Sequence, residues 1–342
     1  MTVIINGDTG ISGVNGSAAN PAITGTDADT GIHFGADSAT ITTGGTERVS
    51  VDSTGAATFS GTVKTSKVEN ATTSNGGVEI DTAGHVQIDG VQLPTAGALA
   101  NRNMVMNGSI CVCQRPTSAA LAHDGVIATH VADRFKTSMQ ADELDGTLER
   151  IYNGANGAPG LPYSLKWTTE TAEAALTGTN IYYIAQYIEG IDGQAPAFGI
   201  PTAQPTTLSF WVKCSLTGTF VFSIYRADSV RNIARTYTVN VADTWEYKEI
   251  SLPADTTGVV SPGTGEGLRL NWHLMSGPGF QGVDASEWGA YQTARWAGVG
   301  ITNNSICTTA GATWEITGVQ YEVGSKATPF EHEHYCAVLQ KC

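Results

Sequence analysis

One stretch of the second half of the sequence carries five aromatic residues within 25 positions. The stretch contains Trp272, Phe280, Trp288, Tyr291 and Trp296. Aromatic rings on loops present flat apolar faces that stack on sugar rings, and all five are candidates for receptor contact. Phe280 lies in a Gly/Pro-rich loop pattern and, with Trp288 and Tyr291, leads this set. Trp272 and Trp296 fall in strand-like runs, which favours packing in a core.

Two histidines near the C-terminal end, His332 and His334, have a spacing that places both imidazoles on one face of a strand. Three chains meeting on an axis would offer six ring nitrogens to one metal ion. The alternative, a pair of solvated histidines, is the favoured one. We therefore expect no firm metal site, and we expect no cofactor.

Three charged residues, Arg115, Asp133 and Arg134, are predicted to form a buried or interfacial ion pair between the first strands. A bidentate Arg–carboxylate pair would fix strand register there. Receptor contact is the weaker alternative.

The six cysteines follow no C-x-x-C spacing, and Cys111 and Cys113 are expected to lie on the same face of a strand. Reduced cysteines that act as small hydrophobic residues are the favoured interpretation. A zinc site is the minority alternative, because no histidine pattern nearby completes it.

Catalytic signatures are missing from the sequence. It contains no G-x-S-x-G, no H-E-x-x-H and no P-loop pattern. A glycosidase needs only two carboxylates at a fixed separation, and 32 acidic residues make chance pairs inevitable. We expect a protein that is not an enzyme, with a glycan hydrolase as the less favoured alternative.

The charge balance limits the partners. The formal net charge of −14 repels nucleic-acid phosphates and anionic membrane surfaces. Residues 1–8 lack the basic start and the apolar run of a signal peptide, and no stretch approaches a membrane span. We expect synthesis in a cytoplasm, no nucleic acid partner and no membrane insertion.

The composition changes near Leu93 and Pro94. Before this point the only aromatic residues are Phe34 and Phe59, whereas all seven tryptophans follow it. The first part is rich in Gly, Ser, Thr, Ala and Asp, and alone it cannot bury enough apolar surface to offset its conformational entropy. It is therefore either disordered or folded only in association with copies of itself.

An internal repeat favours association. Residues 49–61 align without a gap to residues 78–90, and each unit is a short alternating strand, an Asp-x-x-Gly turn and a second alternating strand. Asp caps its own turn, and Gly adopts the positive φ. Repeated units that bury their faces only on neighbours indicate a fibrous stack. Its predicted core residues are Val51, Phe59, Ile80 and Ile88.

The part that begins near Asn101 has the pattern of an all-β globular domain. Strands are predicted at 207–213, 219–225, 235–241, 245–252, 296–301 and 313–322, separated by turn clusters. Residues 140–150 are the best candidate for a short helix. Many short strands with regular turn spacing predict a β-sandwich.

Several motifs resemble those of bacteriophage tail fibres. Residues 29–61, with Thr-Gly-Gly-Thr-Glu-Arg leading into Val-Asp-Ser-Thr-Gly, resemble the shaft segment of these proteins. Asn107–Arg115 and the following Asp-Arg-Phe, 186–190 and 208–213, and above all 316–331 resemble a jelly-roll domain of such fibres. The same jelly roll is shared with carbohydrate-binding modules.

The resemblance implies a fold and a role. The expected fold is all-β, with a fibrous trimeric β shaft followed by a globular jelly-roll β-sandwich. Residues 1–28 are expected to dock to phage tail or adaptor proteins, 29–100 to form the shaft of a homotrimer, and 101–342 to bind a glycan or protein of the host surface. The expected location is the virion, after assembly in the bacterial host cytoplasm. The alternatives are a purely structural virion adaptor or decoration protein and a secreted carbohydrate-binding module.

Overall fold

The computed structural model describes residues 4–6, 10–12, 15–64, 67–69, 77–80, 86–88, 91–92, 101–123, 131–299 and 305–342. The chain divides into two compact units, Met1–Gly84 and His85–Cys342. The division falls inside the range 29–100 that was predicted as the shaft. The two units are described separately.

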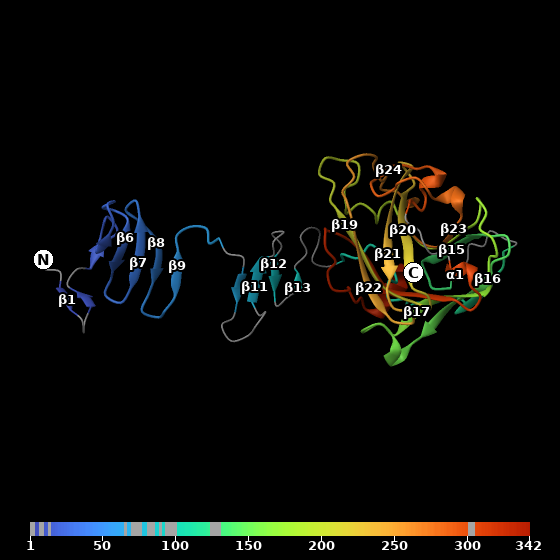
Figure 1. Ribbon diagram of the computed structural model, residues 1–342, viewed down its shortest axis with the longest axis horizontal. Coiled ribbons are helices and arrows are strands. Elements are labelled where there is room, and N and C mark those ends of the chain that lie inside the picture. The colour runs from blue at the N-terminus through green and yellow to red at the C-terminus, as the bar shows by residue number, and fades with distance from the viewer. Residues whose placement is uncertain are drawn as a thin grey trace. The chain divides into compact units, whose positions relative to one another are not determined.

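The first unit consists of short antiparallel strands (Figure 1). Strands β5 to β9 form one five-stranded sheet in chain order. The strands are β1 Ile4–Asn6, β2 Gly10–Ser12, β3 Gly16–Ser17, β4 Asn20–Pro21, β5 Ile23–Thr24, β6 Gly31–Phe34, β7 Ala39–Thr43, β8 Thr46–Val51, β9 Ala57–Phe59, β10 Lys67–Glu69 and β11 Gly77–Ile80.

The predicted Asp-x-x-Gly turn joins β8 to β9. The Asp52 carboxylate accepts hydrogen bonds from the backbone N–H groups of Thr54, at 2.8 Å, and Ala56, at 3.1 Å. Gly55 has φ +85°, a left-handed conformation that glycine adopts without strain. The first repeat is therefore confirmed as a hairpin. In the second repeat β11 and β12 match the predicted strands, and the turn between them lies outside the described residues.

The second unit contains a β-sandwich of two six-stranded antiparallel sheets. Sheet I has the strand order β14-β16-β17-β25-β19-β22, and sheet II has the order β15-β18-β23-β20-β21-β24. The strands of the unit are β12 Val86–Ile88, β13 Val91–Gln92, β14 Ser118–Leu121, β15 Phe135–Gln140, β16 Asp145–Tyr152, β17 Tyr163–Thr171, β18 Ile181–Glu189, β19 Thr206–Cys214, β20 Gly218–Arg226, β21 Arg231–Val239, β22 Glu246–Leu252, β23 Glu266–Ser276, β24 Gly289–Ala290 and β25 Thr313–Val323.

Aromatic side chains pack between the two sheets. Trp167 of sheet I lies 4.6 Å, between ring centroids, from Tyr182 of sheet II, and Phe210 lies 6.0 Å from Trp272. All four side chains are fully buried. Such pairs add about 0.5–1.5 kcal/mol each beyond the area that they bury. The predicted all-β fold with a jelly-roll sandwich is confirmed.

Helices are short. The 3-10 helices are η1 Gly154–Asn156, η2 Pro278–Phe280 and η3 Thr293–Arg295, and the α-helices are α1 Ser305–Thr308 and α2 Tyr335–Lys341. Within the described part of the chain, none is long and apolar enough to cross a membrane.

The prediction of a helix at 140–150 is wrong. Residues 145–152 form β16, which pairs along its length with β17. Leu144, Gly146 and Leu148 are buried at every second position, which is the period of a strand. This pairing and burial override the helix propensity of the Leu-Glu-Arg segment.

The prediction of a strand at 296–301 is also wrong for the residues that the structure describes. Trp296 has φ −56° and ψ −48°, and Gly298 has φ +65°. These helical and left-handed angles put 296–299 in a tight turn after η3.

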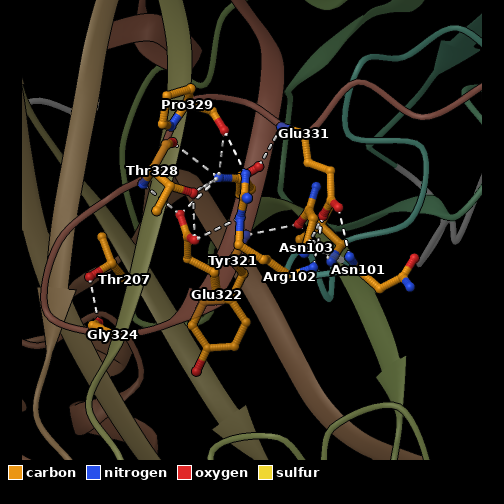
Figure 2. Close-up of polar contacts among 12 residues, drawn as sticks. Asn101, Arg102, Asn103, Thr207, Tyr321, Glu322, Gly324, Thr328, Pro329 and Glu331 are labelled. Carbon is orange, nitrogen blue, oxygen red and sulfur yellow. Dashed lines mark hydrogen bonds and ion pairs between the residues drawn. The ribbon is translucent and has the colours of Figure 1, made fainter. Parts of the chain in front are cut away.

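Glu331 ties the end of the sandwich to its beginning (Figure 2). Its carboxylate accepts hydrogen bonds from the backbone N–H groups of Asn101, Arg102 and Asn103 at 2.7, 2.8 and 3.0 Å. Partial burial raises the pKa of Glu331, but the three N–H donors and the charge of Arg102 lower it more, so the net shift is downward.

Two buried side chains of β25 hold the turn that leads to Glu331. The Gln320 amide donates to Glu322 Oε1 and accepts from the Glu331 N–H, both at 2.8 Å. Glu322 accepts hydrogen bonds from the Thr328 N–H at 2.8 Å and from the Thr328 hydroxyl at 2.7 Å (Figure 2). The polar residues of the 316–331 motif therefore close the sandwich.

Candidate functional site

The outer face of sheet II carries a row of polar aromatic side chains. In the strand register, Arg269 of β23 lies directly between Tyr187 of β18 and Tyr225 of β20. Tyr183 lies opposite His273 on the same face. Side chains on a strand alternate between faces, so the core-facing neighbours Tyr182 and Ile184 leave Tyr183 on the outer side. Strand pairing thus gathers three tyrosines and one arginine.

Segment 291–296 covers part of this row. Tyr291 lies 5.4 Å from Tyr225 and 5.1 Å from Trp296, measured between ring centroids. Trp296 in turn lies 5.4 Å from Tyr225 and 6.0 Å from Tyr183. We call Tyr183, Tyr187, Tyr225, Tyr291, Trp296 and Arg269 the aromatic face.

Arg269 is the cation at the centre of the aromatic face. Its guanidinium lies 5.0 Å from the ring centre of Tyr187, 5.2 Å from that of Tyr225 and 5.4 Å from that of Trp296. Glu266 pairs with it at 2.8 Å. Each cation–π contact contributes about 0.5–2 kcal/mol, so Arg269 holds the rings in a fixed arrangement.

The hydroxyl groups of Tyr187 and Tyr291 remain protonated at neutral pH. Burial raises the pKa of Tyr187 to about 12, against the opposing charge of Arg269, and burial also raises the pKa of Tyr291. Neutral hydroxyls both donate and accept hydrogen bonds. The rings of Tyr187, Tyr225 and Tyr291 are half-buried, whereas those of Tyr183 and Trp296 are buried. The half-buried rings and their hydroxyl groups have a chemistry that suits stacking on a sugar ring.

His273 is buried behind this face, beside two serine hydroxyl groups. Burial lowers its pKa to about 3, so its imidazole is neutral at ordinary pH. Its ring nitrogens lie 2.8 Å from the Ser223 hydroxyl and 3.2 Å from the Ser276 hydroxyl. His273 is therefore a buried structural histidine, and each of its ring nitrogens has a hydrogen-bond partner.

The structure places the five predicted contact residues in different environments. Tyr291, Trp296 and partly buried Phe280 pack in the cluster around Tyr183. Trp272 is fully buried among Phe135, Phe210 and Phe222 in the sandwich core. The prediction of Trp272 as a contact residue is therefore wrong. Its burial agrees with the expectation that its strand-like position favours packing in a core.

Trp288 packs in a structural site instead of the aromatic face. Its indole N–H donates to the Pro253 carbonyl at 2.9 Å, and its ring meets Phe198 edge-on at 5.3 Å. The guanidinium of buried Arg226 lies 4.7 Å from the Trp288 ring and 4.8 Å from the Phe198 ring. Trp288 is therefore a cover for a buried charge.

Sequence reasoning missed Tyr183, Tyr187, Tyr225 and Arg269. These residues alternate along strands with core residues, so they are not clustered in the sequence. A period-two pattern over 181–189 was the available signal, since it separates Tyr183 and Tyr187 from Ile184 and Ile188.

The predicted weak metal candidates are exposed and not brought into a ligand set. His334 caps α2 by accepting a hydrogen bond from the Cys336 N–H at 3.4 Å, and the His332 ring packs 5.0 Å from Phe330. Among the described residues, no group of three or more His, Cys, Asp or Glu side chains could hold a metal ion. All six cysteines are free thiols, and Cys111 and Cys113 lie outside any strand.

A second candidate site is one face of the five-stranded sheet in the first unit. Opposite residues in an antiparallel pair share a face. The register therefore aligns two apolar rows, Ile23–Ile32–Ile41–Val49–Phe59 across all five strands and Phe34–Ala39–Val51–Ala57 across four. We call these nine residues the apolar sheet face.

The apolar sheet face is open to solvent in the single chain. Exposure reaches 50% for Phe59, 48% for Ile41 and 42% for Val51. The predicted shaft-core residues Val51 and Phe59 thus share this face. The side chains of Ile80 and Ile88 lie outside the described residues.

No family model matches the sequence, and no curated protein matches it significantly. Similar solved structures include the enzymatically active domain of tailspike protein 4 of bacteriophage CBA120, with 14% identity over 65% of this chain and a TM-score of 0.33. The match spans 21% of that chain, about a fifth of its length.

Others are carbohydrate-binding modules. A CBM4 module matches with 10% identity over 64% of this chain and 97% of its own, with a TM-score of 0.30. The family 11 module of the cellulase Lic26A-Cel5E of Clostridium thermocellum matches with 10% identity over 65% of this chain and 100% of its own, with a TM-score of 0.29.

Proposed function

We propose that this chain is a non-enzymatic subunit of a bacteriophage tail fibre that binds a host-surface glycan through its C-terminal sandwich. The aromatic face carries this proposal, because Arg269 holds the half-buried rings of Tyr187 and Tyr225 against the buried ring of Trp296, with tyrosine hydroxyl groups beside them. The tail-fibre role is supported by the shaft-like motif at 29–61 and the jelly-roll motif at 316–331.

The proposal includes self-association. An exposed apolar face of this kind on a thin sheet marks a contact surface, and a small sheet needs such packing for stability. Copies of this chain are its proposed occupants, in a homotrimer. The N-terminal residues would dock to tail or adaptor proteins, and the fibre would be assembled in the host cytoplasm and carried in the virion.

A non-enzymatic role is supported by the placement of buried carboxylates. Glu173 accepts hydrogen bonds from the backbone N–H groups of Asp142 and Glu143, Glu322 holds Thr328, and Asp255 pairs with Arg226. Each has a structural task, whereas a hydrolase requires carboxylates that face the substrate.

Binding of labelled full-length protein to a panel of bacterial strains tests the proposal. We expect Tyr225→Ala to reduce retention on the bound strain about tenfold, as loss of about 1.4 kcal/mol of contact would give. Tyr247→Ala is the matched control, because Tyr247 is 44% exposed on sheet I. Periodate oxidation of the cell surface should remove binding, whereas protease treatment should not.

Two outcomes would contradict the proposal. Failure of the full-length protein to bind any strain would favour the alternative of a purely structural adaptor. Equal retention of the Tyr225→Ala and wild-type proteins would exclude the aromatic face as the contact surface.

A further inference from the structure

A pocket of about 270 Å³ opens at the β15 edge of sheet II. It is lined by Arg115, Asp133, Arg134, Lys136, Tyr187 and Cys342. Its volume is just below the roughly 300–1,000 Å³ of sites for drug-sized ligands, which suits one small group such as a single sugar unit. We call it the basic pocket.

Basic side chains dominate the charge of this pocket. Arg115, Arg134 and Lys136 line it in a chain whose net charge is −14. Arg134 pairs only loosely with Glu189, at 3.7 Å. In the described part of the chain, no ion pair involves Arg115 or Lys136. The predicted ion pair between the first strands is therefore replaced by a set of cations around a cavity.

Asp133 is the acidic residue in the lining, and it is engaged in the fold. It is 4% exposed, and its carboxylate accepts a hydrogen bond from the Gln114 N–H at 2.7 Å. That bond holds the backbone next to Arg115. The Asp133 carboxylate therefore binds the protein backbone and, through it, helps to position Arg115.

The backbone around the pocket is fixed in an unusual conformation. Arg134 has φ +72°, which costs a residue with a Cβ roughly 1–3 kcal/mol. The Asn107 amide donates to the carbonyls of Val112 and Asp133, both at 2.9 Å, and so joins the segment before Arg115 to the residue before Arg134. A strained backbone conformation persists only where the surrounding structure fixes it. The pocket is therefore expected to be preformed.

Tyr187 belongs both to the basic pocket and to the aromatic face. The Lys136 ammonium lies 5.1 Å from its ring centre, and the Arg269 guanidinium lies 5.0 Å from it. In the strand register, Lys136 pairs with Ala185, and Tyr187 pairs with Arg269. A ligand on the aromatic face can therefore extend past Tyr187 into the pocket.

We propose that the basic pocket binds an oxyanion, a carboxylate or phosphate group, carried by a sugar unit of the glycan on the aromatic face. The identity of the carrier rests on the proposed function. The anion itself would be bound by the free donors of Arg115 and Lys136, with Arg134 completing the set. Arginine forks match carboxylate and phosphate geometry, and lysine adds a point charge.

Calorimetric titration of the full-length protein with glucuronate, glucose 1-phosphate and glucose tests this inference. We expect at least one charged sugar to bind with a millimolar Kd and glucose to bind more weakly by about tenfold or more. Binding should weaken as salt rises, because exposed charges are screened. A preference for glucuronate identifies a carboxylate ligand, and a preference for glucose 1-phosphate identifies a phosphate ligand.

Paired variants localise the binding. The double variant Arg115→Gln/Lys136→Gln should raise the Kd of the preferred anion about tenfold or more with an unchanged urea midpoint. Lys166→Gln is the control, because Lys166 lies on β17 of the other sheet and pairs with Glu149 at 3.4 Å. Equal affinity for all three sugars, or an unchanged Kd in the double variant, would overturn the inference. Cell binding without anion binding would leave the proposed function standing, and anion binding without cell binding would reject only that function.

Discussion

Arg226 is a fully buried cation at the end of β20, and its charge depends on one carboxylate. Asp255 pairs with Arg226 and also with Arg231, at 2.8 Å. Burial lowers the pKa of Arg226 to about 10, against the opposing effect of Asp255, so the side chain stays charged at neutral pH. Asp255 thus compensates two cations, and Trp288 covers the site.

Asp255→Asn is expected to destabilise the sandwich by about 3–5 kcal/mol, because it leaves a buried charge uncompensated. Urea unfolding followed by tryptophan fluorescence measures the change. Asp192→Asn, at an exposed position, is the control and should shift the free energy of unfolding by no more than about 0.5 kcal/mol. A loss below about 1 kcal/mol for Asp255→Asn would mean that water reaches Arg226.

The identity of side chains was a weaker guide to the site than their strand position. Trp272, Trp288 and Tyr291 were grouped as contact candidates because they are close in the sequence. In the fold they lie in three different environments. Tyr187 and Arg269 are 82 positions apart, yet the β18–β23 register sets them side by side. Contacts of this kind depend on strand order, which local sequence does not encode.

Strands with strong local signals were predictable. Strands β19, β20, β22 and β25 follow from runs of strand-forming residues between turn clusters. The β8–β9 hairpin follows from its period-two pattern and from the Asp52 turn. The two errors have a common cause. At 140–150 pairing with β17 overrides helix propensity, and at 296–299 the η3 turn overrides an apolar run. In both cases tertiary contacts outweigh a weak local preference.

The contact between Glu331 and segment 101–103 predicts a dependence of stability on pH. The pKa of Glu331 is lowered in the folded state from its ordinary value of 4.5, so its carboxylate stabilises the fold at pH values above 4.5. This stabilisation is lost as pH falls through the lower folded-state value, because protonation removes an acceptor.

Glu331→Gln should therefore reduce the free energy of unfolding at pH 7 by about 1–3 kcal/mol, since hydrogen bonds to a charged group are weakened. The difference from wild type should shrink as the pH falls below 4.5. Urea titrations at several pH values measure it, with Glu143→Gln at an exposed position as the control. A difference that stays constant with pH would show that shape, not charge, holds the segment.

At the scale of the whole molecule, the feature to explain is the exposed apolar face of the first unit. One face of its five-stranded sheet is apolar from edge to edge, and on the other face Thr40 and Thr42 are buried. A monomer would expose the apolar rows to water, at a cost of about 25 cal/mol per Å². Association of copies through this face would remove the cost, whereas residues 1–92 contain no tryptophan or tyrosine that could cover the face within one chain.

Light scattering after gel filtration should give full-length protein a mass about three times its chain mass of 35.7 kDa. Phe59→Asp places a charge in the apolar sheet face at its β9 edge, so it should shift the protein toward monomer at micromolar concentration because an unpaired charge would have to be buried. Thr58→Asp is a stringent control, because Thr58 neighbours Phe59 on β9 and pairs with Ser50 on the opposite face. If both variants remain trimeric, the contact between copies does not use the apolar sheet face. If the wild-type protein is a folded monomer, the first unit is stable without a partner, and the shaft assignment fails while the glycan site of the sandwich remains open to its own test.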